Sequence, residues 1–159
     1  METILLEKSV NLHCKYLDIN IMDHLLHILK ENMLYKCTQE NGYILNISKI
    51  DKIISHSIER SNGENIFIIS FFADVFKPKE NMQIEGTVCM IYKDGIFIDI
   101  MNKQKMLIPK NNLTDYEYDE KEKIYKNDDI NIKNGDRIKA IITNVGYSNN
   151  KYSCFGKLI

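Results

Sequence analysis

Residues 86–100, GTVCMIYKDGIFIDI, decide the fold, because two glycines here separate two apolar runs. Gly86 predicts a sharp bend in a strand, as the corner of a small barrel requires. Gly95 predicts the turn into a second strand. In that strand Phe97 alternates with isoleucines, so its ring is expected on the face opposite to the core that they fill. An outward aromatic ring of this kind can stack on a nucleic-acid base.

The chain on either side of this stretch carries further strand signals throughout the C-terminal half. Short apolar runs are separated by turn residues such as Asn134-Gly135. They predict strands at 82–90, 95–101, 105–108, 136–145 and 151–158, with a long insertion at 109–135. Five short strands of this kind predict a small barrel of the OB class.

The N-terminal half predicts a different unit. TILLEKSVNL (3–12) alternates as a strand, and Asn20 begins a run with helical apolar spacing to about Leu34. Strands are then expected at 43–50, continuing towards Ile54, and at 66–72 (IFIISFF), and the polar loop 55–65 lies between them. Phe76-Lys77-Pro78 ends this pattern, since the backbone of the residue before a proline is restricted to extended conformations.

The predicted fold class is therefore α+β. Residues 1–80 form a small domain in which a helix packs on an antiparallel sheet, and residues 81–159 form the five-stranded OB-fold barrel. The boundary is placed near residues 79–81.

Composition excludes several classes of protein. The 159 residues contain 21 Lys+Arg and 22 Asp+Glu, so charge alone does not hold this chain on nucleic acid. No apolar run reaches the ~20 residues that span a bilayer, and the N-terminus lacks a signal-peptide pattern. We expect an intracellular protein without a membrane contact. The four cysteines form no CxxC pair, which predicts reduced, structural thiols.

No residue pattern predicts catalysis. His24 and His27 have metal-ligand spacing, but no further ligands lie in sequence reach, so we expect ordinary helix-surface side chains. Asp119, Glu120 and Glu122 lie in a charged stretch that predicts a solvated loop. The expectation is no catalytic residue, no metal and no cofactor.

Two resemblances follow from these motifs. The spacing Gly86-x-Val88-x-x-Ile91-x-x-x-Gly95-x-Phe97 resembles the RNA-binding OB barrel repeated in the first ribosomal small-subunit protein. That barrel usually has a histidine or polar residue after its third strand, where this chain has Leu107-Ile108-Pro109. The barrel could also serve only as a protein-binding shape.

The order of motifs over the whole chain indicates a more specific family. LEKSVNLHCKYL, GYI, KIDKI and ADVFKP precede the barrel motif, and NGDRIK follows it. This order resembles the seventh-largest subunit of eukaryotic RNA polymerase II and its archaeal counterpart. The FKP segment directly before the first barrel strand is the most specific feature of the match.

The resemblance implies a non-catalytic stalk subunit that supports transcription initiation. Its partners would be the polymerase core subunits, a small helical stalk subunit and, weakly, nascent RNA. It would be nuclear in a cell, and cytoplasmic or virion-associated if viral. The implied core-docking residues are Gly42, Tyr43, Ser55, Arg60, Asn62, Gly63, Phe76, Lys77 and Pro78. The implied RNA contacts are Tyr92, Lys93 and Phe97, followed by Lys103, Lys105, Lys151 and Tyr152.

A second hypothesis remains open. The chain could be a free-standing OB-fold RNA-binding protein of translation or RNA turnover. Such a protein would bind oligonucleotides unaided, and its affinity would fall steeply with salt.

Overall fold

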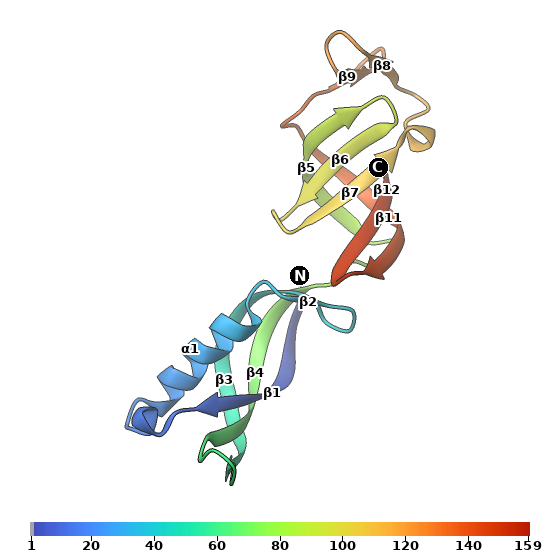
Figure 1. Ribbon diagram of the computed structural model, residues 1–159. Helices are drawn as coiled ribbons and strands as arrows, with labels where there is room; N and C mark the ends of the chain where they lie inside the picture. Colours follow the sequence, from blue (N-terminus) through green and yellow to red (C-terminus); the bar gives the residue numbers. More distant parts are fainter. Residues whose placement is uncertain (1) are drawn as a thin grey trace. The chain divides into compact units, whose positions relative to one another are not determined.

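The computed structural model describes residues 2–159, and the chain divides into two compact units between Lys77 and Pro78. Figure 1 shows a sheet with a helix in the first unit and a closed barrel in the second. The predicted α+β class with a five-stranded barrel is confirmed. Within residues 2–159, no helix has the length and hydrophobicity that crossing a membrane needs.

The first unit is a four-stranded antiparallel sheet in the order β1-β4-β3-β2. A 3-10 turn and a helix connect β1 to β2. The bounds are β1 (Glu2–Leu12), η1 (Cys14–Tyr16), α1 (Ile21–Met33), β2 (Cys37–Thr38), β3 (Gly42–Ile58) and β4 (Asn65–Phe76). The helix begins after Asn20 as predicted, although the Asn20 side chain makes no capping hydrogen bond.

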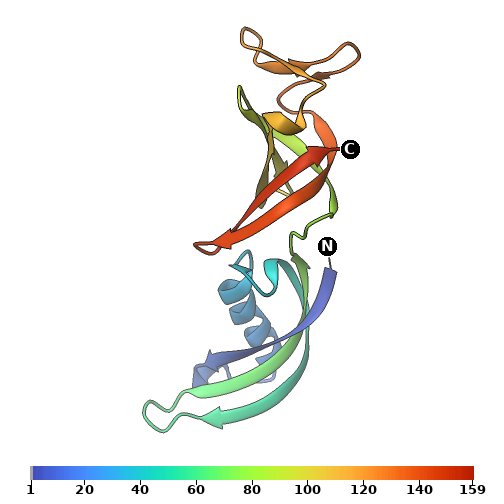
Figure 2. The same cartoon turned by 90° about the vertical axis from the view of Figure 1, so that its right-hand side faces the viewer.

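Helix α1 covers one face of this sheet, on its concave side (Figure 2). Leu25 and Leu29 of the helix are fully buried, because their spacing of four residues places both on the face that meets the sheet. The sheet supplies alternate residues of β4, among them Phe67 and Phe71, so the opposite face of β4 is left without a helix.

Strand β3 is long and curved because it contains four bulges. Its register against β4 shifts between Ile44 and Asn46 and then at every third residue as far as Ser55. Each bulge adds one residue to β3, resets the in–out alternation and increases the twist. Isoleucines at every third position, from Ile44 to Ile53, mark this pattern in the sequence.

The second unit is a closed barrel in the order β11-β12-β7-β6-β5. Its strands are β5 (Gln83–Tyr92), β6 (Gly95–Ile100), β7 (Gln104–Pro109), β11 (Arg137–Ser148) and β12 (Lys151–Leu158). Alternate residues of these strands, including Ile96, Ile98 and Met106, fill the interior. The alternation in β6 thus agrees with the face expected for Phe97.

The seam between β7 and β12 closes the barrel and is its shortest pairing. Two residue pairs, Cys154 with Met106 and Phe155 with Leu107, run parallel there. Side-chain amides extend the seam: Gln104 Nε2 donates to the Tyr152 carbonyl at 2.8 Å, and Asn112 Nδ2 donates to the Gly156 carbonyl at 3.0 Å.

The insertion is a small sheet and not the solvated loop that its charges suggested. After η2 (Lys110–Asn112) come β8 (Glu117–Asp119), β9 (Ile124–Lys126) and β10 (Asn131–Ile132), in the order β10-β9-β8. Tyr125 is 1% exposed, and Ile124 and Ile132 are also buried. The prediction failed because strands of two or three residues are too short to show an alternation of apolar and polar residues.

At Gly86 the structure shows a close approach between two strands. A Cβ atom at residue 86 would meet the Ile98 side chain and the Asp99 carbonyl of β6. The glycine is therefore required because two strands approach closely.

We expect Gly86→Ala to destabilise the barrel by about 1–3 kcal/mol, the usual cost of overpacking. Gly146→Ala is the matched control, because the nearest atoms to a Cβ there lie 4.0 Å away. It should change the free energy of unfolding by less than about 0.5 kcal/mol. Urea unfolding followed by circular dichroism measures both, and equal effects would contradict the close approach.

Candidate nucleic-acid interface

Four apolar side chains form a row across the outer surface of the barrel. The strand register pairs Met90 with Phe97, Phe97 with Leu107, and Leu107 with Phe155. Met90 and Phe155 are each 41% exposed, and the other two are half-buried. We call these four residues the outer row. Tyr92 extends it, because its ring meets the Phe97 ring edge-on with 6.0 Å between centroids.

A β-bulge places two of these side chains outside. The register between β5 and β6 shifts between Val88 and Met90, which makes Cys89 an extra residue. Without it, alternation from the buried Val88 would direct Met90 and Tyr92 into the core. The Tyr92 hydroxyl donates to Met90 Sδ at 3.0 Å, which orients both side chains beside Phe97.

The four lysines and one tyrosine predicted alongside Tyr92 and Phe97 do not form one site. Lys93 lies in the turn between β5 and β6, and Lys105 pairs with Asp99 one step along the strands from the outer row. Lys103 directly precedes β7 and Lys151 is the first residue of the parallel strand β12, so both lie at the opposite end of the barrel from Lys93.

Tyr152 is not available on the surface, because it points into the barrel and is 7% exposed. The exposed aromatic residue of β12 is Phe155, which the sequence reasoning missed. The signal was present: in KYSCFGKL the buried positions are Tyr152, Cys154 and Gly156, so alternation places Phe155 outside. We therefore replace Tyr152 by Phe155 in the candidate interface.

The predicted docking residues of the first unit lie at two ends of its sheet. Gly42, Tyr43, Phe76 and Lys77 come together, since Tyr43 pairs with Phe76 and Lys77 Nζ donates to the Glu40 carbonyl at 2.9 Å. The residues Ser55, Arg60, Asn62 and Gly63 lie at or beyond the other end of β3. The two groups are separated by roughly 35 Å of strand. Pro78 begins the second unit.

Each of the two histidines that the sequence places on the helix surface contacts one carboxylate. The Nε2 atoms of His24 and His27 contact carboxylates of Asp18 and Glu31, respectively. Burial raises the pKa of the Cys154 thiol to about 11, which keeps it protonated at neutral pH. In residues 2–159, no three His, Cys, Asp or Glu side chains are grouped as a metal site would require.

Comparison with known proteins agrees with this geometry. Residues 77–153 match the S1 RNA binding domain. The chain is 27% identical over 96 residues to DNA-directed RNA polymerase II subunit RPB7 of Glycine max, which covers 60% of this chain and 54% of that protein. It is 28% identical over 94 residues to DNA-directed RNA polymerase V subunit 7 of Arabidopsis thaliana, covering 59% and 53%. The chain is thus similar to subunit 7 of RNA polymerases II and V.

This similarity confirms the resemblance that the order of motifs indicated. The matched segment spans about half the length of the curated subunit 7 relatives. The S1 match includes Met90, Tyr92, Phe97 and Leu107 but ends two residues before Phe155. An apo form of RNase R from Mycoplasma genitalium is also similar, at 20% identity and TM-score 0.41 over 50% of this chain and 13% of that one, too weakly to support an argument.

The opposite orientation of neighbouring aromatic residues in β12 is directly testable. Tyr152→Ala should lower the free energy of unfolding of the barrel by about 3 kcal/mol, because it empties a buried position. Phe155→Ala should lower it by less than about 1 kcal/mol. Chemical denaturation measures both, and a larger loss for Phe155→Ala would contradict the register of β12.

Proposed function

We propose that this chain is a non-catalytic, stalk-type subunit of a DNA-directed RNA polymerase. Its first unit docks on the core enzyme and on a small helical stalk subunit. Its barrel contacts emerging RNA through the outer row and supports initiation. Its location is then nuclear in a cell, or cytoplasmic or virion-associated for a virus. Similarity to RNA polymerase subunit 7 proteins supports the assembly, and the exposed aromatic row supports the RNA contact.

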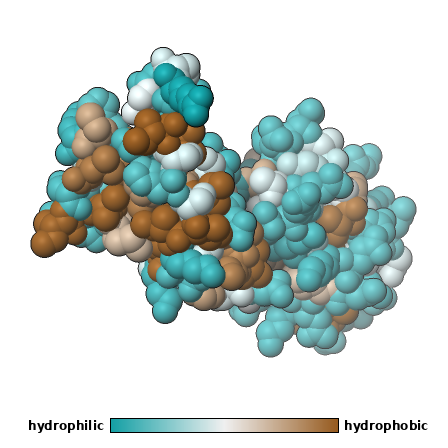
Figure 3. All heavy atoms as spheres, turned by 90° about the horizontal axis from the view of Figure 1, so that it is seen from below, coloured by the Kyte–Doolittle hydropathy of each residue, from teal (hydrophilic) through white to brown (hydrophobic). Residues whose placement is uncertain are grey.

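Exposed hydrophobic side chains support docking through the first unit. Ten of the sixteen large hydrophobic side chains that are exposed in residues 2–159 belong to this unit. Figure 3 shows such side chains gathered on its surface. Leu5, 54% exposed, and Ile68 lie on the sheet face that α1 leaves uncovered. Exposed apolar surface of this kind is typical of protein interaction sites.

Chemistry supports a weak and sequence-tolerant RNA contact by the outer row. Phe97, Phe155 and Tyr92 offer aromatic rings, and every base has a face that stacks on such a ring. Lys93 and Lys105 flank the row with positive charge, while Asp99 beside Lys105 reduces it. So few unopposed cations predict modest affinity and modest salt dependence.

Association with polymerase is tested by purifying the tagged chain from the organism that encodes it, with mass spectrometry of the bound proteins after a moderate salt wash. We expect large polymerase subunits and one small helical protein. A Leu5→Glu, Ile68→Glu variant should recover less of them, because two charges then oppose burial of the open sheet face.

The outcome also separates the two functional hypotheses. Ribosomal proteins, nucleases or RNA recovered in place of polymerase subunits would contradict the stalk proposal. The free-standing RNA-binding protein would then be favoured.

RNA contact is tested on the full chain with fluorescein-labelled single-stranded RNA. Phe97→Ala and Phe155→Ala should each weaken binding by about 1–2 kcal/mol, since each removes a stacking surface. Ile130→Ala is the control, because Ile130 is an exposed apolar residue outside the row. Fluorescence anisotropy measures the affinity, and equal losses in all three variants would rule out the outer row.

A further inference from the structure

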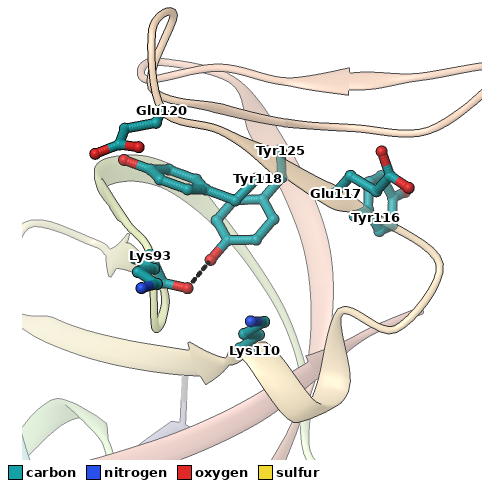
Figure 4. Close-up of a pocket in the computed structure, with 7 residues that line it drawn as sticks. All are labelled: Lys93, Lys110, Tyr116, Glu117, Tyr118, Glu120 and Tyr125. Atoms are coloured by element: carbon teal, nitrogen blue, oxygen red, sulfur yellow. Dashed lines mark hydrogen bonds between the residues drawn. The ribbon is translucent and has the colours of Figure 1, made fainter.

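A cleft lies between the barrel and the inserted sheet, at the end where β5 turns into β6. Its volume is about 480 Å³, within the range of roughly 300–1,000 Å³ that is usual for ligand sites. Lys93 and Lys110 contribute from the barrel side (Figure 4). The inserted sheet contributes the remaining lining residues, which are Tyr116, Glu117, Tyr118, Glu120 and Tyr125.

Tyr125 anchors the wall of this cleft to the barrel. Tyr125 lies almost fully buried, and its single O–H is shared between the Tyr92 carbonyl at 2.6 Å and the Lys93 carbonyl at 2.9 Å. The Tyr118 ring packs against the Tyr125 ring with 5.3 Å between centroids and stays half-exposed. An aromatic face is thus held in place at the opening without being covered.

The turn of the inserted sheet is also ordered by charge. Asp119 accepts hydrogen bonds from the backbone N–H groups of Lys121 and Glu122 and from Lys126 Nζ at 3.0 Å. The bond from Lys126 lowers the pKa of Asp119, so this carboxylate is ionised at neutral pH. The neighbouring Glu120 therefore sits on a defined turn.

Charges of both signs line the cleft without pairing. Among residues 2–159, the structure gives the side chains of Lys93, Lys110 and Glu120 no salt bridge. In Figure 4, Glu120 lies beside the outer end of Tyr118, and the two lysines lie on the barrel side. A ligand that fits this arrangement carries a negative group, a flat ring and a hydrogen-bond donor.

We propose that this cleft binds one unpaired nucleotide of RNA. The base lies against Tyr118, and its phosphate meets Lys93 and Lys110. Glu120 accepts a hydrogen bond from an exocyclic amino group, as carboxylates do from cytosine N4. The proposal rests on the RNA contact proposed for the barrel and adds a second, base-selective position to it.

The cleft continues the path of the outer row. The Tyr92 ring packs on Phe97, whereas the Tyr92 carbonyl accepts the bond from Tyr125. A strand that leaves the row past Tyr92 therefore meets Lys93 next. The outer row carries no charge and selects no base, so the cleft supplies the positive charge and the base selectivity that the row lacks.

The test compares binding of oligocytidylate and oligouridylate of equal length to the full chain, because these bases differ in the exocyclic amino group. Tyr118→Leu and Lys110→Gln should each weaken oligocytidylate binding about five-fold or more. Lys110→Gln should also reduce the slope of log K against log salt by about 0.7. Glu120→Gln should reduce the preference for oligocytidylate.

Lys121→Gln is the matched control, since Lys121 is exposed on the same turn and does not line the cleft. Thermal unfolding shows whether Tyr118→Leu keeps its fold, and the exposed Lys110 provides a variant that does not disturb packing. If Lys110→Gln matches Lys121→Gln while Phe97→Ala weakens binding, the cleft proposal is wrong and the outer row stands. If the unmodified chain binds neither oligonucleotide, both proposals fail.

Discussion

The β-bulges determine where the side chains of this protein point. A strand alternates strictly, so one inserted residue moves every later side chain to the other face. In the first unit, four bulges in β3 keep its isoleucines on the helix side while the sheet curves around α1. In the second unit, the bulge at Cys89 directs Met90 and Tyr92 outward, and another between Ile142 and Asn144 bends β11. The curvature of the first sheet and the outward positions of Met90 and Tyr92 thus share one cause.

Aromatic side chains give a nearly neutral chain its candidate nucleic-acid surface. Its 21 arginines and lysines are nearly balanced by 22 acidic residues, and the lysines of the barrel are spread over both of its ends. What the barrel concentrates is aromatic surface at Phe97, Tyr92 and Phe155. In the RNA contact that we propose, stacking then contributes more than charge.

Much of the fold could be predicted because long apolar strands carry a period. The five barrel strands and α1 lie where alternation and helical spacing placed them. The inserted sheet was missed, since β8, β9 and β10 have three, three and two residues and its core residue Tyr125 sits in a charged stretch. Tyr152 was assigned by its place at a strand end, although alternation from Cys154 directs it inward. The cleft brings together residues 93 and 110–125, a proximity that depends on tertiary packing.

The short seam between β7 and β12 has a consequence for how the barrel behaves as a whole. Closing it joins residues about fifty positions apart through two backbone pairs and two side-chain amides, so loop-closure entropy opposes it more than it opposes the hairpins. This seam is expected to form late in folding and to open first in local fluctuations. Leu107 and Phe155 of the outer row lie on either side of it. A ligand stacked across them bridges the seam, and occupancy of the surface and closure of the barrel become thermodynamically linked.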